Sequence, residues 1–271
     1  MREKGAIGAI GIFDSGVGGL TVLKEIIKAL PHEDCIYLGD TARIPYGTKS
    51  PETVRRFAQK NTEFLVSLGI KYLVVACNTA ASAGLDLISS MFEIPVSGVI
   101  EPGAGRAVKM TKNKRIGVIA TRSTISSEAY QRTISQIAPD ATIFVKACPL
   151  FVPLAEEGET EGEIARLVTE KYLDELIEKD IDTLVLGCTH YPLLKSVIAE
   201  TVGYGVTLID SAVPIALEVR DAFKNHGIGR ESNSPGTIRF YVTDDINNFK
   251  RVGEKFLGFA IENVEHIDII V

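Results

Sequence analysis

Two short segments, one in each half of the chain, place a cysteine directly after a run of apolar residues. The first is VVACNT at residues 74–79, and the second is VLGCTH at residues 185–190. An apolar, β-branched run of this length is typical of a buried strand, which would leave Cys77 and Cys188 at strand carboxyl ends. Ligands of open α/β sheets bind at that edge, so the pattern predicts two thiols facing one cleft.

Predicted strands and helices alternate along the whole chain, which favours parallel sheets. The predicted strands cover residues 7–13, 35–38, 71–76, 95–99, 116–121, 142–147, 183–187 and 206–209, followed after residue 237 by a strand, a helix and a final strand. The segment IGVIAT at residue 116 resembles IGIFDS at residue 10, 106 positions earlier, and the two cysteines lie 111 positions apart. Similar offsets indicate an internal repeat. We therefore predict an α/β fold with two similar lobes, related by a pseudo-twofold axis, with mainly parallel sheets.

Composition and charge narrow the functional class. Hydrophobic residues make up 45% of the 271 residues and charged residues 24%, as in ordinary globular proteins. The net charge of −6 and the lack of a basic run give no reason to expect nucleic acid as a partner. No apolar run approaches the ~18 residues of a membrane span, and the first residues do not read as a signal peptide.

The four cysteines form no CxxC pair, so we expect a reduced, cytoplasmic protein with neither a disulfide framework nor a metal site. Two of them, Cys35 and Cys148, lack a polar context at a strand end. They are expected to be inert buried residues.

A glycine-rich turn follows the first predicted strand. The sequence DSGVGG at residues 14–19 leads into a helical pattern that starts at Leu20. Backbone amides in such a turn can face an anion, but the spacing matches neither GxGxxG nor a Walker A loop. The glycines therefore have two interpretations, a tight turn between strand and helix or an anion site. Asp14 at the strand end is a candidate functional residue in either case.

A second loop, RIPYG at residues 43–47, is fixed by Pro45 and opened by Gly47. Tyr46 in this loop either presents its hydroxyl at the rim of the cleft or packs as a surface aromatic. The helix after this loop should start at Pro51, with Ser50 as its N-cap.

The positions of the two cysteines suggest acid–base chemistry. A cysteine at the N-terminal edge of a helix gains from free backbone amides, which can lower its pKa from about 8.5 toward neutrality. We expect this setting for both Cys77 and Cys188. One thiolate and one thiol on opposite faces of a substrate carbon would invert its configuration, because the thiolate removes a proton and the thiol returns one. Asn78, Thr79 and Thr189 are suitable donors to a substrate carboxylate.

Two further residues are expected close to the cysteines. Asp14 should lie on a strand near Cys77, and His190 lies two residues after Cys188. Because a carboxylate raises the pKa of a nearby thiol, Asp14 suits proton transfer or orientation better than thiolate stabilisation. His190 has two interpretations, a structural histidine or a catalytic one.

Four motifs together carry a resemblance to a known family: DSGVGG at 14–19, PYG at 45–47, ACNTA at 76–80 and GCTHYP at 187–192. In this order they resemble the glutamate racemases, the cofactor-independent two-cysteine enzymes of the Asp/Glu racemase family. The resemblance covers nearly the whole chain. It implies interconversion of L- and D-glutamate, which supplies D-glutamate for bacterial peptidoglycan. It also implies two α/β lobes around a central cleft, residues 1–98 plus 212–271 in one and 99–211 in the other.

The resemblance further implies roles for individual residues. Cys77 would act on one enantiomer with help from Asp14. Cys188 would act on the other, with help from Glu156 and His190. The implied substrate-binding residues are Asp14, Ser15, Pro45, Tyr46, Gly47, Cys77, Asn78, Thr79, Thr121, Thr124, Cys188, Thr189 and His190. The neighbouring Glu157 is the alternative to Glu156.

The resemblance implies a homodimer with no cofactor and with glutamate as its small-molecule substrate. Three other functions remain open on the residues alone. A racemase of another acidic amino acid, such as aspartate, would share the fold and both thiols. A metal site made by Cys77, Cys188 and His190 would have acceptable ligand types but no local chelating pair. A non-catalytic binding protein could use the same cleft for a small anion.

Overall fold

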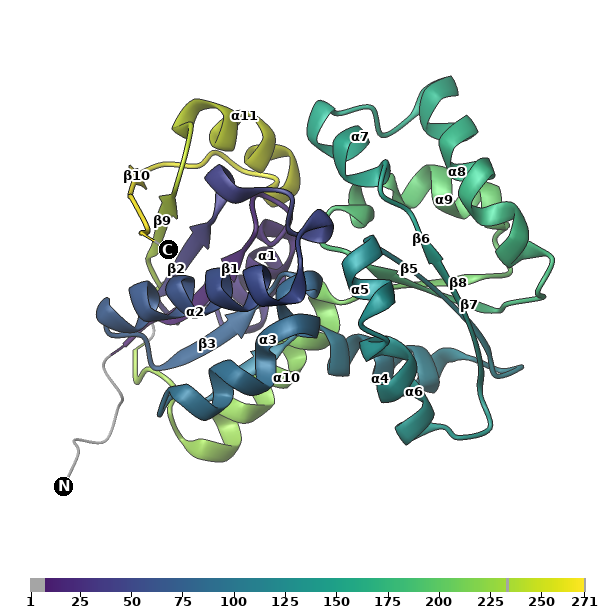
Figure 1. Ribbon diagram of the computed structural model, residues 1–271. Helices are drawn as coiled ribbons and strands as arrows, with labels where there is room; N and C mark the ends of the chain where they lie inside the picture. Colours follow the sequence, from purple (N-terminus) through teal and green to yellow (C-terminus); the bar gives the residue numbers. More distant parts are fainter. Residues whose placement is uncertain (1–7, 233, 271) are drawn as a thin grey trace.

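The computed structural model describes residues 8–232 and 234–270, which form two α/β lobes side by side (Figure 1). The strands of the first lobe are β1 (Ile10–Asp14), β2 (Cys35–Gly39), β3 (Tyr72–Val75), β4 (Val96–Gly98), β9 (Ile238–Val242) and β10 (Val264–His266). Those of the second lobe are β5 (Arg115–Ala120), β6 (Thr142–Ala147), β7 (Thr183–Gly187) and β8 (Thr207–Asp210). Each set forms its own sheet.

The order of the strands reveals the internal repeat. The first sheet runs β10-β9-β2-β1-β3-β4 and the second runs β6-β5-β7-β8. The order β2-β1-β3-β4 thus recurs as β6-β5-β7-β8, so β1 corresponds to β5 and β3 to β7. Every strand pairing among the described residues is parallel. The predicted α/β fold with two parallel sheets is confirmed, although residue 7, the predicted start of the first strand, lies outside the described residues.

Helices cover both faces of each sheet. Around the first sheet lie α1 (Leu20–Ala29), α2 (Pro51–Ser67), α3 (Asn78–Met91), α10 (Ala212–His226) and α11 (Ile246–Leu257). Around the second lie α4 (Ile100–Met110), α5 (Arg122–Ser126), α6 (Ala129–Ile137), α7 (Phe151–Glu157), α8 (Gly162–Ile177) and α9 (Lys195–Val202). Short 3₁₀ turns are η1 (Thr41–Arg43), η2 (Tyr46–Thr48) and η3 (Tyr191–Leu194).

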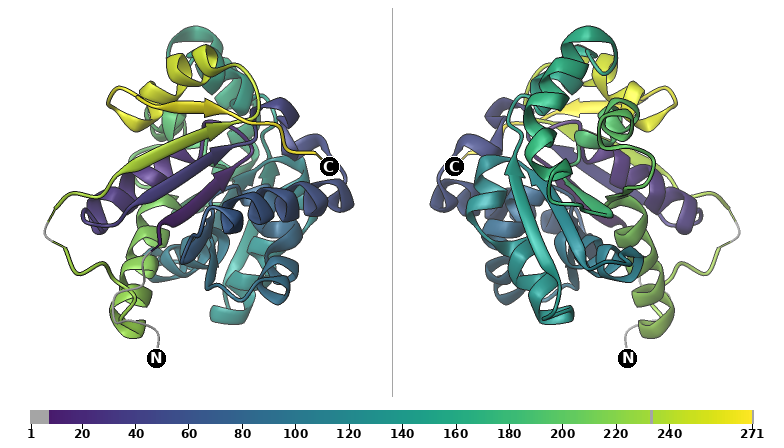
Figure 2. Two further views of the ribbon diagram at one scale, coloured as in Figure 1. Left: turned by 90° about the vertical axis from the view of Figure 1, so that its left-hand side faces the viewer. Right: turned by 90° about the vertical axis from the view of Figure 1, so that its right-hand side faces the viewer.

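The packing of these helices gives each lobe three layers. In the first lobe α2 packs on α3, while α1 packs on α10 and α11 on the opposite face (Figure 2). In the second lobe α4 packs on α6, and α8 packs on α9. Within residues 8–232 and 234–270, no helix has both the length and the apolar character that a membrane crossing requires.

Local sequence signals set the ends of α2 as predicted. The Ser50 side chain accepts a hydrogen bond from the Thr53 amide (3.3 Å), and Pro51 occupies the first helical position. Gly69, with φ of +77°, lies just beyond the end of the helix. A glycine tolerates this left-handed conformation without strain, so it terminates the helix.

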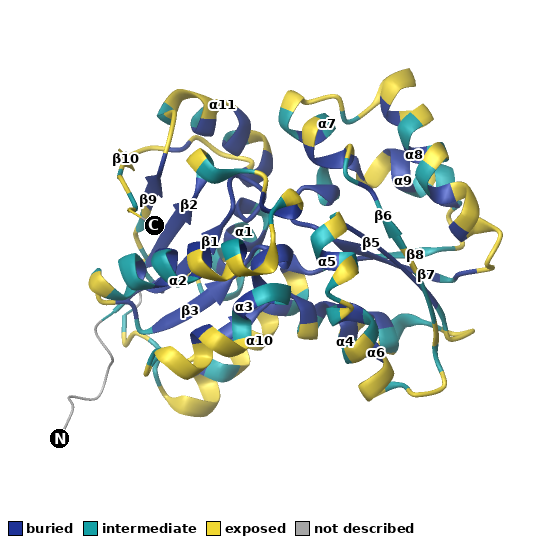
Figure 3. Ribbon diagram, in the orientation of Figure 1, coloured by how far each residue is buried: buried dark blue, intermediate teal, exposed yellow. Residues whose placement is uncertain are grey.

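Burial is greatest in the central strands, which are dark in Figure 3. β1 and β7 are buried along their whole length, whereas the edge strand β6 is partly exposed. One hydrophobic cluster continues from the first lobe into α4, α6 and part of β5, and a second fills the side of the second sheet under α7, α8 and α9. The two lobes are therefore joined by a continuous core along α4 and α10.

Candidate active site

The carboxyl ends of the central strands of both sheets carry the predicted functional residues. In the first lobe β1 ends at Asp14, and Cys77 follows β3. In the second lobe Thr121 follows β5, and Cys188 follows β7. The edge at which ligands of parallel sheets bind is thus supplied by both lobes.

Both cysteines line one small cavity between the lobes. Its lining residues are Ser15, Ile44, Pro45, Tyr46, Gly47, Cys77, Asn78, Thr79, Thr121, Val152, Cys188, Thr189 and His190. The cavity volume is about 20 Å³, room for about one water molecule. The cleft is therefore closed around the two thiols, and a ligand larger than a water molecule could bind only after the lobes move apart.

Most of the predicted substrate-binding residues line this cavity, with a few differences. Asp14, Thr124 and Glu156 lie behind it and contact residues that line it. Ile44 and Val152 line it but were not predicted. Both are apolar, so they carry no chemical signal of their own. In the sequence, Ile44 lies next to Pro45 of the predicted loop and Val152 lies four positions before Glu156, and this proximity is the signal that could have indicated them.

Cys77 caps the first turn of α3. Its carbonyl accepts a hydrogen bond from the Ala81 amide (2.8 Å), and its Sγ lies 3.7 Å from the Ser15 Oγ. Burial, reinforced by the charge of Asp14, raises the pKa of the Cys77 thiol to about 12, against the opposing hydrogen bonds from the Ala80 amide and Ser15. Cys77 thus lies at the N-terminus of a helix, as predicted, but desolvation and a carboxylate outweigh the effect of the helix amides on its pKa.

His190 bridges Cys188 and Glu156. Its Nδ1 lies 3.9 Å from the Cys188 Sγ, and its Nε2 lies 3.0 Å from Glu156 Oε1. Burial by itself lowers the pKa of His190, but the interactions with Cys188 and Glu156 outweigh it and raise the pKa to about 10. The ring is therefore protonated near neutral pH and places a positive charge beside the Cys188 sulfur. The structure places Glu156 on the histidine, and Glu157 is exposed.

Asp14 is fully buried and is held by the glycine-rich turn. Its Oδ2 accepts a hydrogen bond from the Gly16 amide (2.9 Å), and its Oδ1 accepts one from the Thr189 hydroxyl (3.2 Å) of the other lobe. Burial raises the pKa of Asp14, while the charge of His190 and these hydrogen bonds partly offset the rise. The anion that the Gly16 amide binds is thus the chain's own carboxylate.

Gly18 in the same turn lies in tight contact with the second lobe. A Cβ atom at this position would lie 2.4 Å from Thr189 Oγ1 and 2.6 Å from His190 Nδ1. Carbon atoms in ordinary contact are about 3.5–4.0 Å apart. A glycine is therefore required by the approach of the two lobes. Of the two interpretations of the glycine run, the tight turn agrees with the structure.

Three threonine hydroxyls connect the lobes at the other end of the cavity. Thr79 on α3 lies 3.0 Å from Thr121 and 3.1 Å from Thr124, and these two lie 3.0 Å apart. Nearby, the Asn78 Oδ1 accepts a hydrogen bond from the Tyr130 hydroxyl (2.7 Å). Because that oxygen is already bonded, the amide NH₂ group of Asn78 is the part that can donate a hydrogen bond to a ligand.

Tyr46 is buried, and its hydroxyl is satisfied inside the first lobe. The hydroxyl donates a hydrogen bond to Asp40 and accepts one from Asn61 Nδ2 (3.0 Å). Its ring packs on Phe57, with ring centroids 5.4 Å apart. The predicted positions, a hydroxyl at the rim or a surface aromatic, are both wrong, because the Asp40 carboxylate draws the hydroxyl inward.

The remaining two cysteines lie outside the cavity. Cys35 and Cys148 are free and buried, and burial raises the pKa of each thiol. In the part of the chain that the structure describes, no three His, Cys, Asp or Glu side chains are grouped so as to hold a metal ion.

Known proteins that match this chain are racemases. A family model described as Asp/Glu/Hydantoin racemase matches residues 10–218. A glutamate racemase of Geobacter metallireducens is 54% identical over 261 residues, which cover 96% of this chain and 97% of the relative. A glutamate racemase of Syntrophus aciditrophicus is 44% identical over 260 residues, 96% of each chain.

Solved structures agree with these relatives. A glutamate racemase isoform of Bacillus anthracis has a TM-score of 0.94 at 41% identity, covering 97% of this chain and 98% of its own. The glutamate racemase of Francisella tularensis, solved in complex with D-glutamate, has a TM-score of 0.91 at 38% identity with the same coverage. An aspartate racemase of Picrophilus torridus is similar in fold alone, with a TM-score of 0.56 at 21% identity over 82% of this chain and 96% of its own.

Proposed function

The chain belongs to the Asp/Glu/Hydantoin racemase family and is an amino-acid racemase, and we propose that it interconverts L- and D-glutamate. The choice of glutamate is supported by relatives named glutamate racemase that match nearly the whole chain at 44% and 54% identity. The aspartate racemase is similar in fold alone. Another acidic amino acid such as aspartate is the alternative substrate.

A two-base mechanism is supported above all by the placement of Cys77 and Cys188, which come from opposite lobes and line the same cavity. The thiolate of one cysteine accepts the Cα proton and becomes a thiol, while the C–H electron pair stays on the substrate as an enediolate. The thiol of the other cysteine then donates its proton to the opposite face of the carbon and becomes a thiolate. Each turnover leaves the enzyme in the protonation state that suits the opposite enantiomer.

The surroundings of the two thiols differ, which supports a defined resting state. Burial and Asp14 raise the pKa of Cys77, which favours the thiol there. The raised pKa of His190 places a positive charge beside the Cys188 sulfur. The resting enzyme would therefore hold a thiol at Cys77, with Glu156 orienting the charged His190 toward the Cys188 sulfur.

Neutral donors around the cavity are suited to the charge that develops on the substrate. The Asn78 NH₂ group and the hydroxyls of Ser15, Thr79 and Thr189 belong to residues that line the cavity. Donors fixed in place before the reaction stabilise an enediolate without reorganisation. These groups allow the reaction to proceed with no cofactor.

The family resemblance supports the rest of the proposal. Residues 1–98 plus 212–271 and residues 99–211 would act as two bodies that part to admit glutamate and close around it. The enzyme would work in the cytoplasm as a homodimer and supply D-glutamate for peptidoglycan.

Circular dichroism at a wavelength sensitive to the glutamate stereocentre tests this function. Purified protein should racemise L- and D-glutamate, with D-aspartate turned over far more slowly. Cys77→Ser and Cys188→Ser should each abolish racemisation with an unchanged melting temperature, whereas Cys148→Ala, outside the cavity, should retain it. Faster turnover of aspartate than of glutamate would identify aspartate as the substrate. Wild-type turnover in either serine variant would overturn the two-base mechanism.

A further inference from the structure

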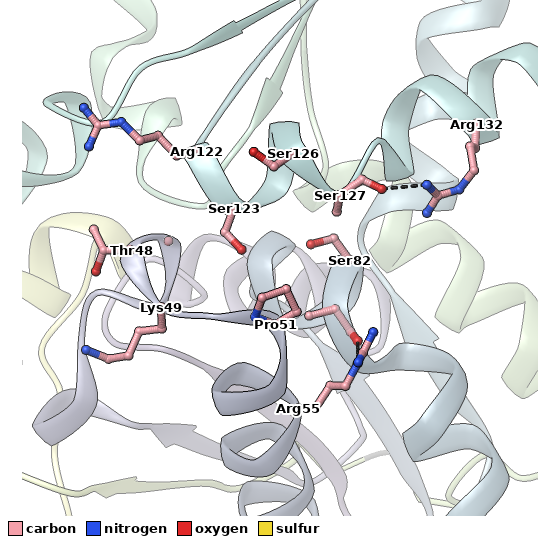
Figure 4. Close-up of a pocket in the computed structure, with 12 residues that line it drawn as sticks. Thr48, Lys49, Pro51, Arg55, Ser82, Arg122, Ser123, Ser126, Ser127 and Arg132 are labelled. Atoms are coloured by element: carbon pink, nitrogen blue, oxygen red, sulfur yellow. Dashed lines mark hydrogen bonds between the residues drawn. The ribbon is translucent and has the colours of Figure 1, made fainter.

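A second and larger hollow lies between the lobes, next to the reaction cavity (Figure 4). It is lined by Gly47, Thr48, Lys49, Pro51, Arg55, Ser82, Ala83, Arg122, Ser123, Ser126, Ser127 and Arg132, and we call it the basic groove. α2, α3 and η2 of the first lobe form one side, and α5 of the second lobe forms the other. Its volume is about 480 Å³, within the range of sites that hold small molecules.

The basic groove has a strong local charge of one sign. Its lining includes the cations Lys49, Arg55, Arg122 and Arg132 and no carboxylate, although the chain as a whole carries a net charge of −6. A cleft lined by one sign of charge raises the local concentration of oppositely charged ligands.

Another hollow that adjoins the reaction cavity has the reverse charge. It shares Ile44 with the cavity and is lined by Glu156, Glu157, Asp244 and Asp245, with a single cation, Arg251. An amino acid with two carboxylates is repelled on that side and attracted on the side of the basic groove.

Two of the four cations of the basic groove donate hydrogen bonds to backbone carbonyls. Arg55 Nε donates a hydrogen bond to the Ala83 carbonyl, and an Arg132 NH group donates one to the Ser127 carbonyl, both at 2.6 Å. Within residues 8–232 and 234–270, none of the four cations has a carboxylate oxygen within 4.0 Å. Their charge is therefore available to a ligand.

The basic groove and the reaction cavity meet at Gly47, which lines both. A Cβ atom at Gly47 would lie 2.6 Å from the Thr121 Cβ of the other lobe, so these two residues form a tight partition. Lys49 and Arg122 each lie one or two positions from this partition and stand at the same end of the groove, while Arg55 and Arg132 stand at the other end (Figure 4). Parting of the lobes at Gly47 and Thr121 would join the groove to the cavity.

We propose that the basic groove is the access route for the substrate and the site where its carboxylates first bind, before the lobes part at Gly47 and Thr121. This inference rests on the proposed function for the identity of the substrate. The ligand is a small dicarboxylate, for which Lys49 and Arg122 supply the charge and Ser82 and Ser123 supply neutral donors.

The double variant Lys49→Gln/Arg122→Gln tests the route. At 10 mM salt, where screening extends over about 30 Å, kcat/KM for L-glutamate should fall about fivefold to tenfold with kcat unchanged. The wild-type kcat/KM should decrease as salt rises to 200 mM, and the variant should show a flatter salt dependence. The control Lys224→Gln/Arg239→Gln removes the same charge from exposed residues outside the cleft and should behave like the wild type. Arg55 is left intact because its charge also acts on Glu52.

A second readout separates the basic groove from the reaction. Low millimolar sulfate should raise the melting temperature of the wild type and of the control, but not that of the double variant, because the anion binds the groove. If no amino acid is racemised, the proposed function fails while the sulfate result still judges the groove. Wild-type kcat/KM in the double variant at 10 mM salt, a loss confined to kcat, or equal sulfate stabilisation of all three proteins would overturn the inference.

Discussion

Gly18→Ala tests whether close contact of the lobes is needed for the reaction. The added Cβ would lie 2.4 Å from Thr189 Oγ1 and 2.6 Å from His190 Nδ1, so the atoms must separate by about 1 Å to reach ordinary contact. Neither neighbour can simply rotate away. The Thr189 hydroxyl bonds Asp14, and Glu156 holds His190.

The magnitude of the effect follows from this geometry. Overpacking costs about 1–3 kcal/mol, and the stiffer unfolded chain offsets about 0.4–1 kcal/mol of that for a Gly-to-Ala change. A melting temperature lower by a few degrees is therefore expected, since about 1 kcal/mol corresponds to roughly 2–4 °C for a chain of this size. The effect on activity should be larger, because a misplacement of about 1 Å can reduce the rate about 100-fold.

The assay is kcat/KM for L- and D-glutamate by circular dichroism, together with the melting temperature. Gly105→Ala in α4 is the matched control, since a Cβ atom there meets nothing within 4 Å. It should leave turnover unchanged and raise stability by about 0.5–1 kcal/mol, as expected for a helix interior. Wild-type kcat/KM in both directions for Gly18→Ala would refute the argument that the lobes must close at this contact.

Three further predictions concern the second lobe and α2. Glu156→Gln should lower kcat in the direction in which Cys188 removes the Cα proton, because His190 loses its charged partner. Glu157→Gln should have wild-type rates in both directions by the same assay. Because folding raises the pKa of His190 from 6.5 to about 10, protonated His190 stabilises the folded protein fully below about pH 6.5, and this contribution is lost as the pH rises through about 10. The free energy of unfolding measured in urea should therefore decline over this range. An equal decline in His190→Asn would contradict the prediction. Ser50→Ala removes the N-cap of α2 and should lower the free energy of unfolding by about 1 kcal/mol with kcat unchanged; unaltered stability would show that the cap contributes nothing.

The fold was predictable because its signals are local. Apolar runs of strand length, alternating with helical spacing, indicated the order of the elements and hence parallel sheets. The cap at Ser50 and the stop at Gly69 lie within a few residues of the helix ends that they fix. The resemblance between residues 10–15 and 116–121 corresponds to β1 and β5, which hold equivalent places in the two sheets.

The features that the sequence did not reveal depend on contacts between distant residues. The pKa of Cys77 is governed by burial and by Asp14, 63 positions earlier, and not by the local helix end. The direction of the Tyr46 hydroxyl depends on Asp40 and on Asn61 in α2. The glycine run indicates a turn at Gly18, but the space that a side chain at this position would need is occupied by the other lobe.

The basic groove shows the same limitation on a larger scale. Lys49 and Arg122 lie 73 positions apart and belong to no motif, so no sequence signal indicates that they stand at the same end of one hollow. Their common location results from the approach of η2 in one lobe to α5 in the other.

Deuterium incorporation measures most directly whether each face of the substrate carbon has its own thiol. L-Glutamate is incubated in D₂O, and both enantiomers are analysed by mass spectrometry before a tenth of the substrate is converted. The two-thiol account predicts deuterium at Cα in the D-glutamate formed and almost none in the remaining L-glutamate, with the mirror-image result from D-glutamate. Equal early labelling of substrate and product would mean that one base serves both faces, and the account would be wrong.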